Sequence, residues 1–394
     1  MGKTLAMIHN NPIRVADGRL FVDRKFHIGM RYYVGQVDAR IVTVHPTSAP
    51  SSLIMDQVEV SCDELGYEVV TVDVNRAGQP TAAGVECLRE LLAKCDLMYG
   101  YGLGCIGLAR ELDIPYVMVL EYDLRTQIVV TTTAVSSPLR KVSRAVKCAV
   151  SYACDALDMR QARSVHCNGY PIYDETARFN ANRLLYLDSR MPASLVIPED
   201  QLLSRLQSLP HRTLRLLYSG RYEPMKGAAD AVSVAVDCLR QGMDIEMHCY
   251  GQGRLRDEMR RIATQAPVAG RIFVHDAIPY PELAARAREF DLFVCCHIQS
   301  DPSCTYLESF GAGVPIVGYV NRMWGRMQAE SDAGLVAPVH QPHQIAAKIR
   351  QLIGDVPSLR NMSVRARHFA LAHSSEQEFA KRVSSINAVL GEAG

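Results

Sequence analysis

The chain has 394 residues, too many for one ordinary hydrophobic core, and this length predicts two or three domains. Hydrophobic residues make up 48% and aromatic residues 7% of the chain, as is typical of a globular protein, which argues against disorder. The formal net charge is only +1, so the chain offers no general electrostatic attraction to nucleic acid.

Twelve cysteines are scattered along the chain without a C-x2-C pair, and we expect them to be small core side chains in a reducing cytoplasm. The apolar run near the N-terminus is too short for a signal peptide, and no stretch reaches the ~20 apolar residues of a membrane span. We therefore expect a cytoplasmic location, with peripheral attachment at the inner face of the membrane as the alternative.

Short apolar runs in the first half of the chain alternate with helical patterns. Strands are expected at 4–8, 40–45, 68–73, 97–100 and 116–120, and helices near 53–65, 83–94 and 105–112. The alternation predicts a mostly parallel sheet with helices on both faces, and it recurs between 214 and 319.

A polar segment with Pro192, Pro198 and Pro210 separates the two halves and is the best candidate for a linker. We expect an N-terminal α/β domain at 1–190, a linker at 191–212, a C-terminal α/β domain at 213–375, and a last helix at 376–394 that packs back toward the first domain.

Residues 218–227, Y-S-G-R-Y-E-P-M-K-G, join a strand expected at 214–219 to a helix expected at 228–239. Gly220 and Gly227 bracket this turn and let backbone N–H groups approach an anion, while the helix N-terminus adds partial positive charge. Arg221 offers a bidentate guanidinium and Lys226 a compact ammonium. The loop predicts a diphosphate site, although such residues alone also fit a solvated basic loop.

Two later segments bear on this prediction. Gly251 and Gly253 form a G-x-G after the strand expected at 245–249, a pattern that by itself more often marks a tight turn. Residues 300–317 read S-D-P-S-C-T-Y-L-E-S-F-G-A-G-V-P-I-V, in which a loop with small hydroxyl side chains enters a short helix that carries Glu308. The helix ends at a strand expected at 315–319.

In order and spacing, these segments resemble the retaining nucleotide-sugar glycosyltransferases of the GT-B type, the group 1 or family 4-like enzymes. The resemblance is specific from 214 to about 339 and general elsewhere. It implies two Rossmann-like doubly wound domains that face each other across a cleft. It also implies that Arg221 and Lys226 neutralise the donor diphosphate, and that Glu308 binds the ribose hydroxyls. The remaining donor-binding residues that it implies are Gly220, Gly251, Gly253 and Ile278, the last in a loop at 275–279 that faces the base.

One position departs from the family pattern. A second glutamate usually stands eight residues before the one that Glu308 matches, and here that position is Ser300. Asp301 has taken over the acidic role, or the loop backbone does the work, or activity is lost. We expect Asp301 or the amides of 303–306 to orient the sugar, while Thr305 and Tyr306 reach the diphosphate and Ser303 lies beside the donor. The alternative is that Asp301 only caps a helix or turn.

Signals in the first half are fainter. In the family, the first strand-to-helix loop brings a glycine to the donor phosphates, and Gly29 lies where that contact is expected. A family histidine after the strand at 116–120 is absent, which leaves Glu121 and His27 as acceptor-side candidates; a solvated acidic loop explains Glu121 equally well. Residues 138–154 predict a basic amphipathic helix, for which a plain surface helix is favoured over contact with an anionic membrane.

The resemblance implies a retaining transferase that moves a sugar from a UDP- or GDP-sugar to a hydroxyl of a glycan, a lipid-linked molecule or a small molecule. It implies no cofactor and no metal ion. A nucleotide-binding pseudoenzyme, or another GT-B enzyme such as an epimerase or a phosphorylase, remains the alternative. Peripheral contact with a membrane stays open as well, whereas a nucleic-acid partner is not expected.

Overall fold

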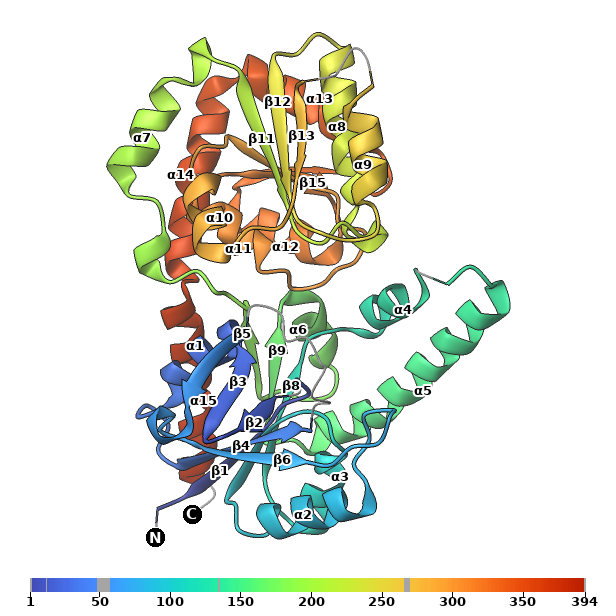
Figure 1. Cartoon of the computed structure of the whole chain (residues 1–394), viewed down its shortest axis with the longest axis vertical. Coiled ribbons are helices and arrows are strands. Elements are labelled where there is room, and N and C mark those ends of the chain that lie inside the picture. The colour runs from blue at the N-terminus through green and yellow to red at the C-terminus, as the bar shows by residue number, and fades with distance from the viewer. Residues whose placement is uncertain (1, 12, 48–56, 134, 266–269, 393–394) are drawn as a thin grey trace.

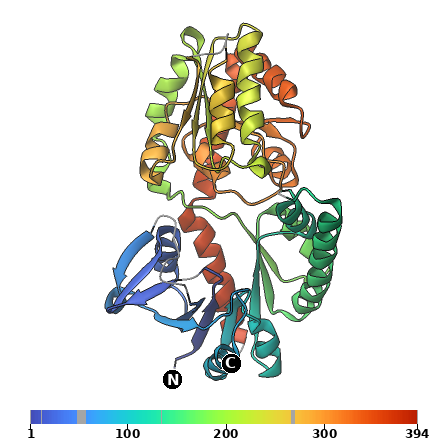
Figure 2. The same ribbon diagram turned by 45° about the vertical axis from the view of Figure 1, so that its right-hand side comes forward.

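The computed structural model describes residues 2–11, 13–47, 57–133, 135–265 and 270–392. These residues form two α/β domains, with the C-terminal domain above the N-terminal domain in Figure 1. Figure 2 shows the last helix descending from the upper domain into the lower one. Within the described part of the chain, no helix combines the length and the apolar character needed to cross a membrane.

The N-terminal domain is built on a parallel sheet whose described strands have the order β10-β9-β8-β7-β1-β4-β6. These strands are β1 (Thr4–Ile8), β4 (Arg40–Pro46), β6 (Glu68–Val72), β7 (Leu97–Gly100), β8 (Tyr116–Leu120), β9 (Ser164–Asn168) and β10 (Arg183–Tyr186). Its helices are α1 (Arg24–Tyr33), α2 (Ala82–Leu92), α3 (Cys105–Glu111), α4 (Leu124–Thr132), α5 (Pro138–Gln161) and α6 (Tyr170–Thr176). Strand β1 is apolar from Leu5 to Ile8 because both faces are covered: Leu5 and Met7 pack in one core cluster, and Ala6 and Ile8 in another.

The C-terminal domain has a second parallel sheet, with the order β13-β12-β11-β14-β15-β16 among the described strands. These strands are β11 (Leu214–Ser219), β12 (Ile245–Tyr250), β13 (Ile272–His275), β14 (Leu292–Cys295), β15 (Ile316–Tyr319) and β16 (Gly334–Ala337). Its helices are α8 (Ala228–Arg240), α9 (Arg256–Ala263), α10 (Tyr280–Ala287), α11 (Thr305–Gly311), α12 (Arg322–Ser331), α13 (Pro342–Gly354) and α14 (Val356–Ala372). Strands are added to one side of β11 up to β13 and then, from β14, to its other side, so the order of the strands reverses between β11 and β14. We call this place the reversal point. The crevice beyond such a point is where open α/β sheets bind ligands.

A small antiparallel sheet of β2 (Arg14–Ala16), β3 (Arg19–Asp23) and β5 (Gln57–Ser61) flanks the N-terminal domain. The helix predicted near 53–65 is wrong from 57 onward, where β5 is followed by a short 3-10 turn; residues 53–56 lie outside the described part. Val58 and Val60 alternate with polar residues and pack against Leu20 and Val22. This period of two, typical of a strand, determined the local structure.

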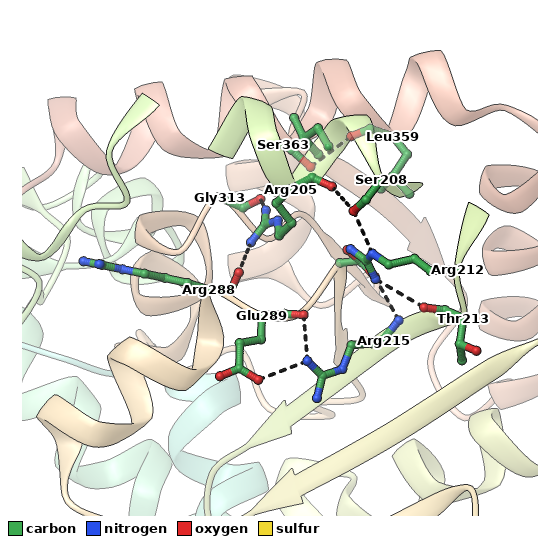
Figure 3. Close-up of polar contacts among 12 residues, drawn as sticks. Arg205, Ser208, Arg212, Thr213, Arg215, Arg288, Glu289, Gly313, Leu359 and Ser363 are labelled. Atoms are coloured by element: carbon green, nitrogen blue, oxygen red, sulfur yellow. Dashed lines mark hydrogen bonds and ion pairs between the residues drawn. The ribbon is translucent and has the colours of Figure 1, made fainter. Parts of the chain in front are cut away.

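The stretch predicted as a linker, 191–212, is not an irregular connector over its whole length. It contains α7 (Glu199–Gln207), whose Leu202 and Leu206 are buried in the core of the C-terminal domain. Arg205 donates hydrogen bonds to the backbone oxygens of Arg288 and Ala312 at 2.9 Å and of Gly313 at 2.5 Å (Figure 3). Because these bonds fix α7 to the C-terminal domain, the chain crosses between the domains at 187–198.

Helix α15 (Ser375–Glu392) forms the second connection between the domains. Its Ile386, Val389 and Leu390 are buried in the same core cluster as Leu5 and Met7 of β1. In addition, His166 of β9 places its Nε2 atom 2.9 Å from the Ser385 hydroxyl oxygen. The last helix is therefore a structural part of the N-terminal domain.

Burial of His166 predicts that the fold loses stability in mild acid. Burial first, and the nearby Arg382 second, lower the pKa of the His166 imidazole to about 3. Below the unfolded value of about 6.5, the unfolded chain takes up a proton that the folded chain cannot, so the free energy of unfolding should fall by about 2 kcal/mol per such histidine at about pH 5.

Urea unfolding between about pH 7 and about pH 5 measures this slope. The His166→Gln variant should show a smaller slope, and His343→Gln, an exposed change on α13, should behave like the unaltered protein. An identical pH dependence in all three proteins would contradict this explanation.

Candidate functional site

A cleft of about 730 Å³ lies between the two domains, at the carboxyl ends of the N-terminal strands. The residues at the ends of β1, β7, β8 and β9 that line it are Ile8, Gly100, Leu120 and Asn168. Its walls are formed by helix α1, by α15 and by the segment at 187–198 that crosses between the domains, which we call the crossover segment. The C-terminal domain contributes Tyr280 and Pro281. The cleft is therefore largely a feature of the N-terminal domain.

Glycines hold the loops after β11 and β12 close together. A Cβ atom at Gly251 would lie 1.9 Å from the backbone oxygen of Gly220, and one at Gly253 would lie 2.6 Å from that of Tyr222. Gly227 has a φ of 60°, and a Cβ there would lie 1.9 Å from the backbone oxygen of Cys296. These contacts give the glycines a structural reason to be present, and a contact with phosphate remains a prediction for Gly220, Gly251 and Gly253.

Lys226 and Asp301 form an ion pair at the reversal point of the C-terminal sheet. The ammonium lies 2.5 Å from a carboxylate oxygen, and the two side chains are 7% and 10% exposed. Burial alone would raise the pKa of Asp301, but the Lys226 charge outweighs burial and lowers it. The two residues that were predicted on separate loops are thus brought together. One carboxylate oxygen of Asp301 pairs with Lys226, and the other is buried without a hydrogen-bond partner among the described residues.

His297 lies against this pair and was not predicted from the sequence. Its Nδ1 atom is 3.8 Å from the second carboxylate oxygen of Asp301 and 3.4 Å from the Tyr306 hydroxyl. Burial, and then the Lys226 charge, lower the pKa of His297 to about 3, so its ring is neutral at physiological pH. A neutral ring leaves Asp301 as the main counter-charge of Lys226.

Arg221 differs from Lys226 in its surroundings. Its side chain is exposed, and within the described residues no ion pair or side-chain hydrogen bond engages its guanidinium. Its charge nevertheless reaches both domains: burial raises the pKa of Tyr122 to about 12 and the Arg221 charge opposes this shift, while burial and Lys226 lower the pKa of His297 and Arg221 adds to that shift. Arg221 therefore faces the gap between the domains with its charge free to meet an anion.

Glu308 is paired with an arginine from the crossover segment. Arg190 donates from Nε to one carboxylate oxygen at 2.6 Å, and its guanidinium lies 4.3 Å from the centre of the Tyr280 ring. The second carboxylate oxygen of Glu308 is buried and has no hydrogen-bond partner. A cavity of about 10 Å³ adjoins Glu308 and Tyr280, which is too small for a nucleoside.

The remaining donor-side residues lie around the start of α11. Ser300 accepts a hydrogen bond from the Arg322 amide at 3.1 Å, and Ser303 and Thr305 join their hydroxyls at 2.9 Å. The side chain of Tyr306 does not reach a diphosphate as expected, because it is fully buried and stacks against Trp324. Ile278 is partly buried and packs on the core below the loop.

Residues of the N-terminal domain require a correction. Gly29 and His27 lie within helix α1 and not in the strand-to-helix loop that was expected. A Cβ atom at Gly29 would lie 3.0 Å from Phe379, so this glycine allows α1 to pack against α15. His27 is absent from the cleft lining, whereas Glu121 lines the cleft. Burial first, and then the Asp188 and Asp301 carboxylates, raise the pKa of Glu121 although Lys25 opposes them.

A contact among three residues near Glu121 was also not predicted from the sequence. Lys25 of α1 pairs with Asp188 of the crossover segment, and its ammonium lies 3.4 Å from the thiol of Cys304 in the C-terminal domain. Burial, and then the Asp188 charge, raise the pKa of the Cys304 thiol to about 12, so it stays protonated. No local pattern marks these residues, since they are 163 and 116 positions apart. Within the described ranges, no group of three or more His, Cys, Asp or Glu side chains is arranged to hold a metal ion.

Two parallel sheets across a cleft define a protein of the GT-B fold, and solved structures show the same arrangement. HepE of Anabaena, solved in complex with UDP-glucose, is 13% identical over 99% of this chain and 98% of its own, with a TM-score of 0.62. Sucrose-phosphate synthase from Thermosynechococcus elongatus is 14% identical over 100% of both chains, with a TM-score of 0.67. At these identities the likeness is one of fold.

The C-terminal domain is similar to a known family. Residues 203–369 match the family described as glycosyl transferases group 1. D-inositol 3-phosphate glycosyltransferase 1 of Catenulispora acidiphila is 26% identical over 49% of this chain and 47% of its own length. Phosphatidyl-myo-inositol mannosyltransferase of Mycolicibacterium smegmatis is 26% identical over 38% of this chain and 39% of its own length. The chain thus matches less than half the length of these curated relatives.

The buried ion pair predicts how the fold responds to its loss. Lys226→Met leaves Asp301 as a buried carboxylate without a cation, and breaking such a pair typically costs about 3–5 kcal/mol. Adding Asp301→Asn should recover most of that stability, because the uncompensated charge is removed as well.

Urea unfolding of the single and double variants measures both effects. Arg221→Met is the matched control, since the exposed and unpaired side chain should change the free energy of unfolding by less than about 0.5 kcal/mol. If Lys226→Met were as stable as the unaltered protein, or if the double variant recovered nothing, the pair would not stabilise the fold in this way.

Proposed function

We propose that the chain is a retaining glycosyltransferase that moves a sugar from a nucleoside-diphosphate sugar, UDP- or GDP-linked, to a hydroxyl acceptor. The observation that carries this proposal is the set of Arg221, Lys226 and Glu308 around the reversal point of the C-terminal sheet, in a chain whose N-terminal domain holds a large cleft. The group 1 family of the C-terminal domain supports it. So does the solved complex of HepE with UDP-glucose, as a protein of the same fold.

The leaving nucleoside diphosphate gains negative charge as the bond to the sugar breaks, and a positive group placed there lowers the barrier. Arg221 is free to meet this charge directly. The acceptor oxygen forms its bond to the anomeric carbon on the same face, and the departing phosphate oxygen takes the acceptor proton. Closure of the domains would exclude water and limit hydrolysis of the donor.

The donor would replace two partners that the chain itself supplies. A diphosphate carries the charge that Asp301 presents to Lys226, and ribose hydroxyls would donate to the carboxylate that Arg190 now engages. The unpartnered oxygen of Glu308 is ready to accept one such hydroxyl. Binding of the donor would therefore replace internal ion pairs with contacts to the donor. Before the donor binds, these internal pairs ensure that neither Lys226 nor Glu308 is a buried charge without a counter-charge.

The acceptor would enter the cleft of the N-terminal domain. Tyrosines and phenylalanines line much of its wall, and Glu121, Asp155 and Lys25 add charged groups. Glu121 is our candidate for holding the acceptor hydroxyl, because it lies in the cleft and, through Asp301, is electrostatically coupled to the donor loop. We propose no cofactor and no metal ion for the reaction, since Arg221 and Lys226 supply positive charge at the diphosphate.

One observation favours a second candidate, a pseudoenzyme that binds the nucleotide without transfer. Ser300 replaces the usual glutamate and is engaged as a cap for the Arg322 amide, while Asp301 is engaged by Lys226. The second carboxylate oxygen of Asp301 has no hydrogen-bond partner in the described part of the chain, but it is buried and is the one acceptor left on these two residues beside the Ser300 hydroxyl. The pseudoenzyme would bind nucleoside diphosphate yet release none from any nucleotide sugar.

The test incubates the protein with a panel of UDP- and GDP-sugars and sugar or lipid acceptors, and measures free nucleoside diphosphate and glycosylated product. We expect release with at least one donor, and product with retained anomeric configuration by NMR. Nucleotide binding without release from any donor would favour the pseudoenzyme, and absence of both would reject the donor site.

Arg221→Ala should lower turnover about a hundredfold while leaving the fold intact, because an exposed charge that stabilises the leaving group is lost. Arg254→Ala is the matched control, as Arg254 is an exposed arginine of the neighbouring loop, paired with Glu223. Steady-state release of nucleoside diphosphate measures both variants. Equal turnover in Arg221→Ala and Arg254→Ala would remove Arg221 from the diphosphate site.

Substitutions of Glu308 and of Arg190 should change the affinity for the nucleoside diphosphate in opposite directions. Glu308→Gln should weaken binding of the nucleoside diphosphate about tenfold, because a charged acceptor of the ribose hydroxyls is lost. Arg190→Ala should strengthen binding a few-fold, because a partly exposed pair that competes for Glu308 contributes up to about 1 kcal/mol. Calorimetric titration with the nucleoside diphosphate measures the affinity of both variants. Weaker binding by both variants would mean that Arg190 belongs to the nucleotide site.

A further inference from the structure

Helices α4 and α5 form an arm that extends from the N-terminal domain (Figure 1). Helix α5 has 24 residues, but its buried residues, Tyr152, Asp155, Ala156 and Met159, all lie in its second half. The outer half packs on α4: Arg144 donates to the backbone oxygen of Thr131 at 2.7 Å. The rest of the outer surface of α5 faces solvent.

Large aliphatic side chains form one stripe along this exposed surface. Leu139, Val142, Val146 and Val150 recur every three or four residues and are 83%, 63%, 56% and 62% exposed. This spacing places them on one face of the helix, away from the buried Tyr152 and Ala156. Single exposed aliphatic residues are common on soluble proteins, but a continuous stripe marks an interaction surface.

The charged residues around the stripe indicate which kind of partner it would bind. Residues 124–154 contain Arg125, Arg140, Lys141, Arg144 and Lys147 and no aspartate or glutamate, whereas the whole chain has a net charge of only +1. Helix faces that bind protein helices usually carry both signs of charge, and two copies of this arm would bring like charges together. An apolar stripe flanked only by basic residues instead suits the surface of an anionic bilayer.

We propose that the α4–α5 arm docks the protein on anionic phospholipid membranes, with the stripe in the interfacial region and the basic residues at the lipid headgroups. Gln127 of α4 and Ser151 and Asp155 of α5 line the cleft, so the base of the arm is part of the cleft wall. A docked arm therefore holds the mouth of the cleft near the lipid surface. If the proposed transferase function is correct, an acceptor carried by a lipid has a short path into the site.

The test is sedimentation with vesicles of phosphatidylcholine alone or mixed with phosphatidylglycerol, without donor or acceptor. We expect binding only to the mixed vesicles, weaker at high salt because screening reduces the attraction. The Val142→Ser/Val146→Ser and Arg140→Glu/Lys147→Glu variants should each bind at least about tenfold more weakly.

Matched controls alter exposed residues of the C-terminal side. Leu203→Ser/Ile353→Ser and Arg240→Glu/Arg261→Glu change the same kinds of exposed side chain and should bind like the unaltered protein. Circular dichroism checks that every variant is folded.

Three results would overturn the proposal: no preference for anionic vesicles, unchanged binding by the arm variants, or a dimer by light scattering that Val142→Ser/Val146→Ser dissociates. The last result would assign the stripe to a second copy of the chain. Because no reaction is measured, failure here leaves the transferase proposal standing.

Discussion

A buried ammonium needs a counter-charge, and in this chain Asp301 provides it for Lys226. The need is strong because the surroundings are nearly closed: both side chains are at most a tenth exposed, and the adjacent His297 is neutral. The pair joins the loop after β11 to the loop after β14, which are the two loops that flank the reversal point of the sheet. The same contact therefore shapes the crevice and occupies its main cation. Whatever binds there must offer Lys226 an anion as good as Asp301.

Glu308 is a second buried charge, and it too is paired with a residue of opposite charge, in this case one from outside its own domain. Glu308 is paired with Arg190 of the crossover segment, and Lys25, Asp188 and Cys304 join the N-terminal domain, the crossover and the donor loop. If the proposed function is correct, donor binding at Glu308 would be coupled to the relative position of the domains through the crossover. A ligand that displaces Arg190 from Glu308 would also release one restraint on that segment, which suits an enzyme that closes around its substrates.

The sequence was sufficient for the fold class and for most strands of the two sheets, but it did not predict β9, β10 and β16. Continuous apolar runs such as Thr4–Ile8 and Leu214–Ser219 form doubly covered parallel strands because no other structure buries both faces so simply. It failed at 57–65, where a short period-two pattern competed with a helical one, and at Gly29, where a hairpin between β1 and α1 moved the expected loop. Predictions of the two domains and of GT-B architecture are confirmed by the two sheets and the solved structures.

For the candidate site, the sequence predicted the loops but not the ion pairs that join them. Arg221, Lys226, Asp301 and Glu308 carry local signals, since glycines and helix starts surround them. Arg190, Lys25 and His297 do not, because their importance arises from contacts between segments far apart in the chain. The side chain of Tyr306, which was expected to reach the diphosphate, instead turns into the core, where its ring stacks on Trp324. Ion pairing across domains becomes visible only in three dimensions.

The central claim is that Asp301 occupies Lys226 until a diphosphate replaces it. Calorimetric titration of a nucleoside diphosphate into the unaltered protein and into Asp301→Asn tests it most directly. Because the competing carboxylate is removed while the ammonium remains, Asp301→Asn should bind the diphosphate about tenfold more tightly. Binding that is unchanged or weaker in Asp301→Asn would contradict the claim and would make Asp301 a partner of the donor.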